Sequence, residues 1–192
     1  MNILIIQGHP DPESYNRALG EAYAKGARQS GHEVKALNIS DLDFNPNLAY
    51  GYRKRSELEP DLLKAQEDIL WCQHLVVVHP IWWGSVPALL KGFFDRVLLP
   101  GFAFQKHEGS ISRWDKLLRG RSAHIICTAD QPEFFYRLRY GQPNIRALHG
   151  LTFSFVGIRP VRKSFIGPVR LSSQAFRERH LRRVERAGVK GL

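Results

Sequence analysis

The sequence contains little cysteine. Only Cys72 and Cys127 occur in 192 residues. Neither belongs to a Cys-x-x-Cys pair or lies beside histidines at zinc-ligand spacing, which excludes a disulfide framework and a zinc site as organising features. Cys72 falls near a predicted helix end and Cys127 inside a predicted strand. We expect both to be reduced packing residues, and we expect no bound metal.

Long apolar runs are also missing. The longest, such as residues 75–78, are far too short to span a bilayer and are followed directly by His79 and Pro80. The first residues, from Met1 to Gly8, lack the basic region and small-residue cleavage site of a secretory signal. These absences predict a cytoplasmic protein without a transmembrane segment.

Two common phosphate-binding fingerprints are absent as well. The chain contains no Gly-x-Gly-x-x-Gly, which the Rossmann dinucleotide site requires, and no loop that ends in Gly-Lys-Ser/Thr, which a Walker site requires. A nucleotide phosphate, if one is bound, must therefore be held by a different kind of loop.

Acidic residues are outnumbered, since 28 Lys and Arg against 18 Asp and Glu give a formal net charge of +10. Such a charge attracts phosphates, nucleic acid or anionic membranes. The densest basic cluster lies near the C-terminus and contains Arg177, Arg179, Arg182, Arg183, Arg186 and Lys190. Because pairs such as Glu178 with Arg182 are ordinary helix-surface chemistry, we interpret this cluster as a solvated face and expect no nucleic-acid partner.

Apolar strand-like runs and helical patterns alternate along the chain. The predicted strands are 2–7, 33–38, 75–79 and 123–128, and the predicted helices are 16–30, 58–71 and one with Pro87 in its first turn. The length and the 43% hydrophobic content suit one domain over residues 1–192. The β-α alternation predicts a flavodoxin-like α/β fold: a doubly wound, five-stranded parallel sheet in the order 2-1-3-4-5, with helices on both faces.

The pattern is less regular in the second half. Residues 100–120 are predicted to form an excursion, because Gly101, Gly109 and Gly120 punctuate aromatic and charged residues. Residues 131–150 resist assignment. We expect 151–155 and the region to 169 to supply a last strand and a connection, and Ser173 to cap a terminal helix that ends near Gly188.

The loop after the first predicted strand is stiffened by Pro10 and Pro12 and ends at Ser14, where a helix begins. A helix start offers free N–H groups and a positive dipole end, so a Ser hydroxyl at this position suits the phosphate of a mononucleotide. The alternative is that Ser14 only caps the helix. The residues by themselves leave both interpretations open.

The loop after the third strand contains two adjacent tryptophans, Trp82 and Trp83. Indole rings in a loop could pack against an isoalloxazine ring, in a mostly apolar site with a few fixed hydrogen-bond donors. Alternatively, one Trp fills the core and the other a subunit interface. After the fourth strand, Thr128 and Asp130 add hydroxyl and carboxylate groups.

These loops carry a family pattern. His9, Ser14 and Asn16 match His-x-x-x-x-Ser-x-Asn, and residues 80–104 match Pro-x-x-Trp-x-x-x-Pro-Ala-x-Leu-Lys-Gly-x-x-[Asp/Glu]-Arg-Val followed by Gly-Phe-Ala-[Phe/Tyr]. The chain resembles the NAD(P)H:quinone oxidoreductases, the DT-diaphorase-like enzymes of the flavodoxin fold. It also resembles the bacterial Kef-associated and drug-modulator flavoproteins.

The resemblance implies a homodimer with FAD or FMN as cofactor, NAD(P)H as electron donor and a quinone or similar acceptor. The residues implied on the phosphate side of the flavin are His9, Ser14, Tyr15 and Asn16. Those implied at its ring are Pro80, Ile81, Trp82, Trp83 and Thr128. Tyr136 takes the place of the active-site tyrosine, and Phe104 that of an aromatic residue in the substrate pocket, often contributed by the partner subunit.

The chain departs from the family pattern at two positions. The residues 128–131 read Thr-Ala-Asp-Gln where the family has Thr-x-Gly-Gly, and Gln142 replaces the histidine of the mammalian enzymes. The leading hypothesis is two-electron transfer by a ping-pong mechanism through one aromatic slot, formed by Trp82, Trp83, Phe104 and Tyr136. The alternatives are a regulatory subunit in peripheral contact with a membrane transporter, and a flavodoxin-type electron carrier, against which the basic charge argues.

Overall fold

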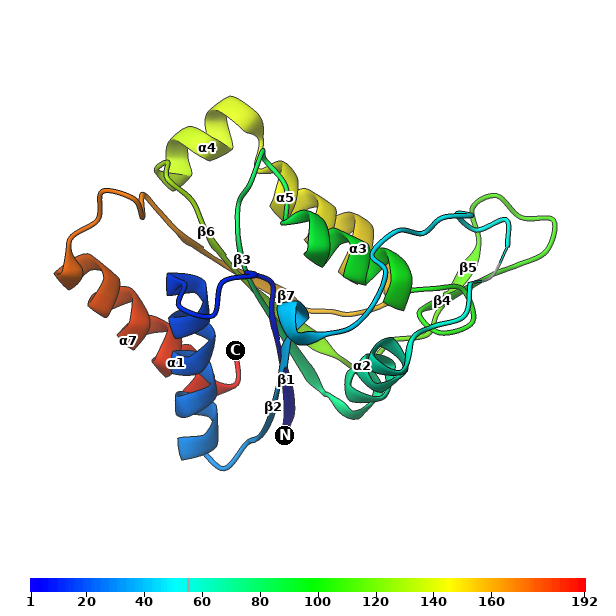
Figure 1. Cartoon of the computed structure of the whole chain (residues 1–192), viewed down its shortest axis with the longest axis horizontal. Helices are drawn as coiled ribbons and strands as arrows, with labels where there is room; N and C mark the ends of the chain where they lie inside the picture. Colours follow the sequence, from blue (N-terminus) through cyan, green and yellow to red (C-terminus); the bar gives the residue numbers. More distant parts are fainter. Residues whose placement is uncertain (55) are drawn as a thin grey trace.

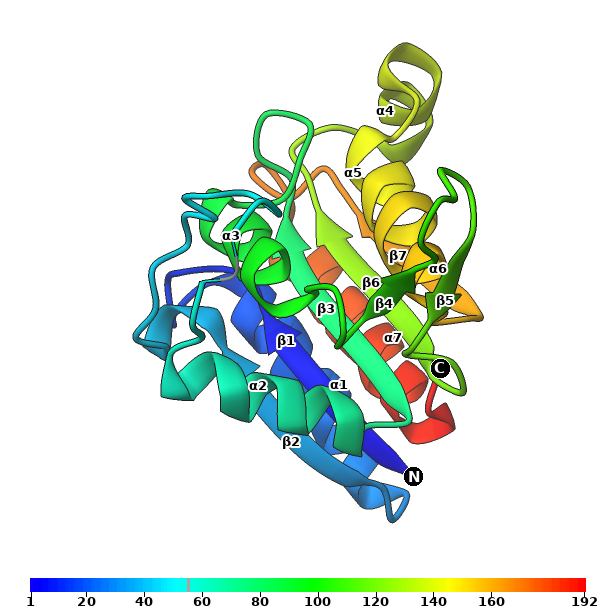
Figure 2. The same cartoon turned by 90° about the vertical axis from the view of Figure 1, so that its right-hand side faces the viewer.

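A five-stranded parallel sheet forms the centre of the computed structural model, which describes residues 1–54 and 56–192 (Figures 1 and 2). Its strands are β1 (Asn2–Gln7), β2 (Glu33–Asn38), β3 (His74–Pro80), β6 (Ser122–Thr128) and β7 (Val161–Ile166). They lie in the order β2-β1-β3-β6-β7 and all pair in parallel. Numbered among themselves, the strands follow the order 2-1-3-4-5, so the predicted fold and topology are confirmed.

Helices cover both faces of this sheet (Figure 1). On one face α1 (Tyr15–Gln29) and α7 (Gln174–Lys190) lie side by side over Ile3 and Ile5 of β1. On the other face α2 (Pro60–Trp71) and α3 (Ala88–Val97) pack over Leu4 and Ile6. Because successive strand residues point to opposite faces, the continuous apolar run of β1 supplies both cores at once.

The ends of the two long helices follow the sequence signals. Ser14 Oγ accepts a hydrogen bond from the Arg17 N–H at 3.2 Å, and Ser173 Oγ accepts one from the Phe176 N–H, also at 3.2 Å. Both serines therefore act as N-caps. The predicted cap at Ser173 is confirmed, although α7 continues two residues past Gly188, to Lys190.

The irregular second half contains structure that the sequence did not predict. Residues 100–120 include a small antiparallel hairpin of β4 (Phe104–Lys106) and β5 (Trp114–Lys116). Residues 131–150 include α4 (Glu133–Tyr140). A further helical stretch follows, made of α5 (Pro143–Ile145), the π-helix η2 (Arg146–Phe153) and α6 (Ser154–Val156), and a short 3-10 helix η1 (Ile39–Asp41) follows β2.

The last strand lies later than residues 151–155, which are helical. Leu148, Phe153 and Val156 are buried against the core of the α3 face, whereas β7 pairs with β6 as an edge strand. An edge strand can carry polar side chains, and β7 contains Arg162 and Lys163. The more apolar run before it, which is helical, was therefore mistaken for the strand. The prediction of a strand within 151–169 holds only for Val161–Ile166.

The two cysteines are free and buried. Burial raises the pKa of the Cys72 thiol to about 11 and that of the Cys127 thiol to about 12. Both are therefore inert packing residues, as predicted. No helix within the described residues is long and apolar enough to cross a membrane.

Candidate functional site

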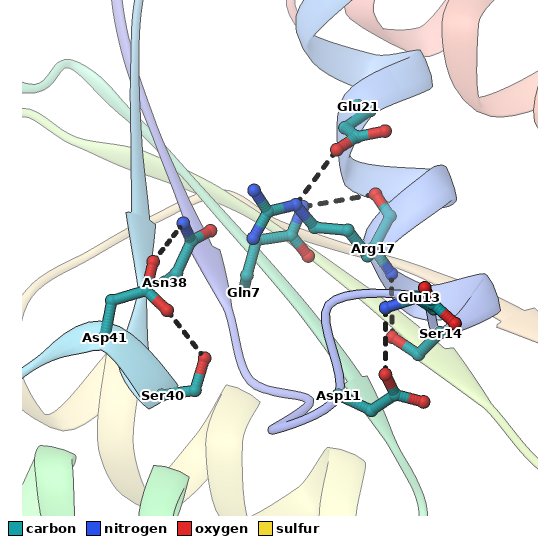
Figure 3. A network of polar contacts seen from close by, with 9 residues as sticks. All are labelled: Gln7, Asp11, Glu13, Ser14, Arg17, Glu21, Asn38, Ser40 and Asp41. Carbon is teal, nitrogen blue, oxygen red and sulfur yellow. Dashed lines mark hydrogen bonds and ion pairs between the residues drawn. The ribbon is translucent and has the colours of Figure 1, made fainter.

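The loop between β1 and α1 is folded back on itself by local hydrogen bonds (Figure 3). The Asp11 carboxylate accepts from the Glu13 N–H at 2.8 Å, and the Asp11 carbonyl accepts from the Ser14 N–H at 3.3 Å. His9 Nδ1 accepts from the Asp11 N–H at 3.0 Å. A short side chain that binds its own backbone two residues on is typical of a tight turn. The loop thus delivers the chain to the start of α1 in one conformation.

The start of α1 has the properties of an anion site. Ser14 Oγ binds the Arg17 N–H, but the N–H groups of Tyr15 and Asn16 have no acceptor in the part of the chain that the structure describes. The first turn of α1 contains no acidic residue. Free N–H groups at the positive end of a helix dipole attract a negatively charged group.

A buried hydrogen bond connects this helix start to the end of β6. Asn16 Nδ2 donates to Thr128 Oγ1 at 3.0 Å, and the Thr128 carbonyl accepts from the Ile81 N–H at 2.8 Å. Three chain segments, which follow β1, β3 and β6, are thereby tied together at the carboxyl edge of the sheet. This edge is where doubly wound sheets bind their ligands.

The two tryptophans occupy a tight turn after β3. Trp82 and Ser85 exchange two backbone hydrogen bonds, of 3.0 and 2.9 Å. The residues between them, Trp83 and Gly84, have φ of +51° and +74°, as in a type I′ turn. Glycine adopts this conformation freely, whereas a tryptophan in this conformation has a strained backbone.

This turn holds the indole of Trp83 out of the protein. The Trp83 side chain is fully exposed, at 105%, and Trp82 is exposed at 44% with its ring edge-to-face against His9 at 5.4 Å. The N–H groups of Trp83 and Gly84 make no hydrogen bond among residues 1–54 and 56–192. The packing of the protein does not account for a strained residue that projects a large apolar ring into solvent beside unpaired donors, which makes this turn the candidate ligand-binding loop.

A cavity of ≈ 730 Å³, the tryptophan cavity, opens between this turn and α4. Its lining comprises Pro80, Ile81, Trp82, Trp83, Gly84, Thr128, Ala129, Asp130, Gln131, Tyr136, Tyr140 and Pro143. The structure therefore brings together the residues predicted at the flavin ring. Tyr15 lies further away, since its hydroxyl donates to the Arg177 carbonyl at 2.9 Å.

Tyr136 is buried in the wall of the tryptophan cavity. Its hydroxyl lies 3.0 Å from Asn144 Oδ1 and 3.2 Å from the Gly84 carbonyl, so its proton is directed at acceptors within the protein. Burial raises the pKa of this phenol. Sequence reasoning missed Asn144, and it missed Tyr140, whose exposed ring lines the cavity beside Tyr136. Both fall in the stretch for which the pattern predicted no element.

Two residues from the family comparison lie elsewhere. Phe104 packs edge-on against Phe155 at 5.1 Å and lines an adjoining cavity of ≈ 590 Å³, so the expectation that it shares one slot with the tryptophans is wrong within a single chain. Gln142 is buried between Glu133 and Lys163, with hydrogen bonds of 3.2 and 2.7 Å, and does not line the tryptophan cavity.

Known proteins share the fold of this chain. A sequence model of the family described as "Flavodoxin-like fold" matches residues 1–187. The chain belongs to this family. The match covers nearly the whole chain, so the family assignment applies to all five strands of the sheet.

Two relatives and one solved structure illustrate the similarity of this flavodoxin-like chain. The protein named "Uncharacterized NAD(P)H oxidoreductase" from Haemophilus influenzae is 32% identical over 93% of this chain and 89% of its own length. "Ribosyldihydronicotinamide dehydrogenase-like protein traD" from Penicillium crustosum is 31% identical over 67% of this chain. The NAD(P)H:quinone oxidoreductase from Methanothermobacter marburgensis superimposes with a TM-score of 0.84 at 26% identity, over 98% of each chain.

The resemblance to NAD(P)H:quinone oxidoreductases that the motifs indicated is thereby confirmed. The match with this chain spans only 57% of the length of the Penicillium protein.

Proposed function

We propose that this chain is a flavin-dependent NAD(P)H:quinone oxidoreductase that works in the cytoplasm. The observation that carries the proposal is the exposed indole of Trp83, held at positive φ beside unpaired N–H groups at the mouth of a 730 Å³ cavity. Such an arrangement suits a planar aromatic ligand with a polar edge.

The groups present fit a flavin. The N–H groups of Tyr15 and Asn16, with the Ser14 hydroxyl and His9, would hold the phosphate that FMN and FAD share. A serine hydroxyl can accept the Arg17 cap bond and still donate its proton to a phosphate, so capping and phosphate binding are compatible at Ser14. The residues that would line the flavin ring are Pro80, Ile81, Trp82, Trp83 and Thr128.

When bound, the flavin supplies the chemistry: it takes up two electrons as a hydride from NAD(P)H and passes them to the acceptor. The chain orients the reactants and excludes water. Because both tryptophans line the same cavity and the sequence contains no Gly-x-Gly-x-x-Gly for a separate nucleotide site, we infer that NAD(P)H and the quinone occupy this cavity in succession, which is a ping-pong scheme. Thr128, Tyr136 and Tyr140 are the lining residues that carry a hydroxyl group, and the two phenols are the proposed hydrogen-bond donors to the acceptor oxygen.

We also infer a homodimer. Phe104 lies outside the tryptophan cavity of its own chain, so the place in the substrate pocket that the family pattern assigns to it requires a partner subunit. Symmetric dimers are the commonest oligomers. Light scattering of the flavin-loaded protein tests this inference, and a monomer that retains full activity would contradict it.

Ser14 provides the test of the flavin site. Ser14→Ala should weaken FMN or FAD binding by about 1.5–3 kcal/mol, the range for a hydrogen bond to a charged group, measured by fluorescence titration. Ser14→Asp is the matched variant, since aspartate caps a helix as well as serine does but repels a phosphate.

We expect Ser14→Asp to keep the stability of the flavin-free protein and to bind flavin at least as poorly as Ser14→Ala. Wild-type affinity in the aspartate variant would reduce Ser14 to a capping role. If the wild-type protein bound neither FMN nor FAD, the proposed function itself would fall.

Tyr136 provides the test of the mechanism. Tyr136→Phe should slow the half-reaction with quinone by about a hundredfold and spare the half-reaction with NAD(P)H, because only the former builds negative charge on a substrate oxygen. Stopped-flow spectroscopy separates the two. Tyr140→Phe is the matched control on the same helix.

If Tyr136→Phe slowed both half-reactions equally, Tyr136 would have only a structural role, through its hydrogen bonds to Asn144 and Gly84. A larger effect of Tyr140→Phe would transfer the donor role to Tyr140. Intersecting rather than parallel double-reciprocal lines, with a benzoquinone as acceptor, would refute the ping-pong scheme. Tight flavin and nucleotide binding without turnover would favour the alternative of a regulatory subunit.

A further inference from the structure

Helix α4 (Glu133–Tyr140) projects from the body of the protein (Figures 1 and 2). Of its eight residues only Tyr136 is buried. The helix follows β6 at the carboxyl edge of the sheet and forms one wall of the tryptophan cavity through Tyr136 and Tyr140. Its other face therefore lies at the protein surface directly beside the cavity.

That outer face is apolar. Phe134, Phe135 and Leu138 are exposed at 63%, 42% and 78%. With 100° between successive helical residues, Phe134 and Leu138 lie on the side of the helix opposite Tyr136 and Tyr140. Phe135 lies at the edge of this face, with its ring edge-to-face against that of Tyr140 at 6.1 Å. Exposed apolar residues scattered singly need no explanation, but three that gather on one projecting turn mark an interaction site.

Two arginines border this apolar stripe. By the same helical geometry Arg137 flanks it on one side and Arg139 on the other, and both are exposed. Neither forms an ion pair in the part of the chain that the structure describes, whereas Glu133 pairs with Lys163 at 3.7 Å. An apolar stripe between cations is typical of a helix that lies in the headgroup region of an anionic membrane.

We propose that the outer face of α4, made of Phe134, Phe135, Leu138, Arg137 and Arg139, docks on an anionic lipid surface. The apolar side chains enter the boundary between headgroups and acyl chains, and the arginines bind lipid phosphates. Docking in this way brings the tryptophan cavity to within about 10 Å, the diameter of one helix, of the bilayer, where lipophilic quinones reside. The delivery of a membrane quinone rests on the proposed function, whereas the docking does not.

The charge distribution favours a lipid surface over a second copy of this chain. In a symmetric contact through this face the same patch meets itself, so the arginines of one subunit would approach those of the other without acidic partners. An anionic membrane instead neutralises them, and the net charge of +10 adds a long-range attraction to such a surface.

The test is flotation of the flavin-loaded protein with vesicles of phosphatidylcholine alone and of phosphatidylcholine mixed with phosphatidylglycerol. Phe134→Ser combined with Leu138→Ser removes apolar side chains that line neither the tryptophan cavity nor the adjoining one. Arg137→Gln combined with Arg139→Gln removes two charges from α4. Arg183→Gln combined with Arg186→Gln removes two charges from exposed positions of α7 and is the matched control.

We expect the wild-type protein to float with anionic vesicles only, and each α4 double variant to bind them at least about tenfold more weakly. The α7 variant should lose less than half as much binding as the α4 arginine variant. Equal losses in the two arginine variants, or unchanged binding of the serine variant, would overturn the proposal, as would a wild-type protein that ignores anionic vesicles.

Two further measurements distinguish lipid docking from the proposed function and from self-association. Flavin titration of the same preparations reports the proposed function, so a protein that binds vesicles but no flavin refutes that function and leaves the docking intact. Light scattering reports self-association. If the serine variant changes from dimer to monomer, the outer face of α4 is a subunit contact and the lipid proposal is wrong.

Discussion

A Gly188→Val protein is expected to lose more than about 3 kcal/mol of unfolding free energy, at the upper end of what overpacking costs. A Cβ atom at Gly188 would lie 2.1 Å from the Tyr23 carbonyl oxygen and 3.0 Å from the Ala27 nitrogen. Both are backbone atoms of α1 and cannot rotate away. The crossing is reciprocal, because a Cβ at Gly26 would lie 2.0 Å from the Glu185 carbonyl oxygen.

This contact between α1 and α7 also bears on the candidate site. The Tyr15 hydroxyl donates to the Arg177 carbonyl near the start of α7, and burial raises the pKa of Tyr15 to about 12. If α7 moves away, Tyr15 loses the hydrogen-bond partner of its hydroxyl, and Tyr15 is itself part of the proposed phosphate site. We therefore expect Gly188→Val to weaken flavin binding together with stability.

Urea unfolding followed by circular dichroism measures the effect on stability. Gly150→Val is the matched control, because Gly150 is exposed, has an ordinary φ, and a Cβ there would meet no atom within 4 Å. Similar unfolding free energies for the two variants would show that α1 and α7 do not cross as closely as described.

Acid should destabilise the protein well before carboxylates are protonated. Burial lowers the pKa of His74 and of His79 to about 4, and it also lowers the pKa of His124. His79 donates from Nδ1 to the Pro80 carbonyl at 2.9 Å, and His74 Nδ1 lies 2.7 Å from Ser122 Oγ. The Nε2 atoms of both have no partner within the described residues. These imidazoles are therefore neutral in the folded protein near pH 7.

The direction of the effect follows from which state binds protons. In the unfolded chain a histidine takes up a proton as the pH falls below about 6.5, whereas the folded protein resists until about pH 4. The stability is thus fully present above pH 6.5 and is lost as the pH falls from 6.5 towards 4. The difference in pKa between the unfolded and the folded state corresponds to about 3 kcal/mol of unfolding free energy for each of His74 and His79.

Urea unfolding at a series of pH values between 8 and 5 tests this expectation. His79→Leu, a substitution of similar volume, should reduce the dependence of the unfolding free energy on pH, and His149→Gln at an exposed position should leave it unchanged. An unfolding free energy that is constant from pH 8 to pH 5 in the wild-type protein would contradict the neutral, buried state of these histidines.

Much of the site could be predicted because strand ends converge in this fold. The runs at 2–7, 75–79 and 123–128 are apolar at most positions, as strands buried on both faces tend to be, and a loop with polar or aromatic residues follows each of them. Parallel strands place those loops at one edge of the sheet. Thr128 could therefore be assigned to the site of Trp82, 46 positions away in the sequence, and the structure places both in one cavity.

The missed residues depend on packing that has no local pattern. Asn144 follows a left-handed Gln142 and reaches Tyr136 only because α5 turns back under α4. Tyr140 faces the cavity because α4 turns its apolar side outward, the reverse of the amphipathic rule by which helices are recognised. A helix that exposes Phe134 and Leu138 cannot be told from a buried one by its sequence.

The sequence by itself determined the alternation of strands and helices, the cap at Ser173 and the loops that follow the buried strands, because these depend on residue spacing and on short-range hydrogen bonds. The strand order was predicted from the general rules of doubly wound sheets. Only the tertiary structure decided three other features: the positive φ that exposes Trp83, the separation of Phe104 from the tryptophan cavity, and the orientation of Tyr136 towards Asn144. The packing of Phe104 against Phe155 joins segments distant in the chain, and a contact of that kind leaves no periodic signal in either segment. The Trp83 turn and the contact of Tyr136 with Asn144 are more local, but positive φ is typical of glycine rather than tryptophan, and α4 has no buried apolar stripe that would predict which way Tyr136 faces.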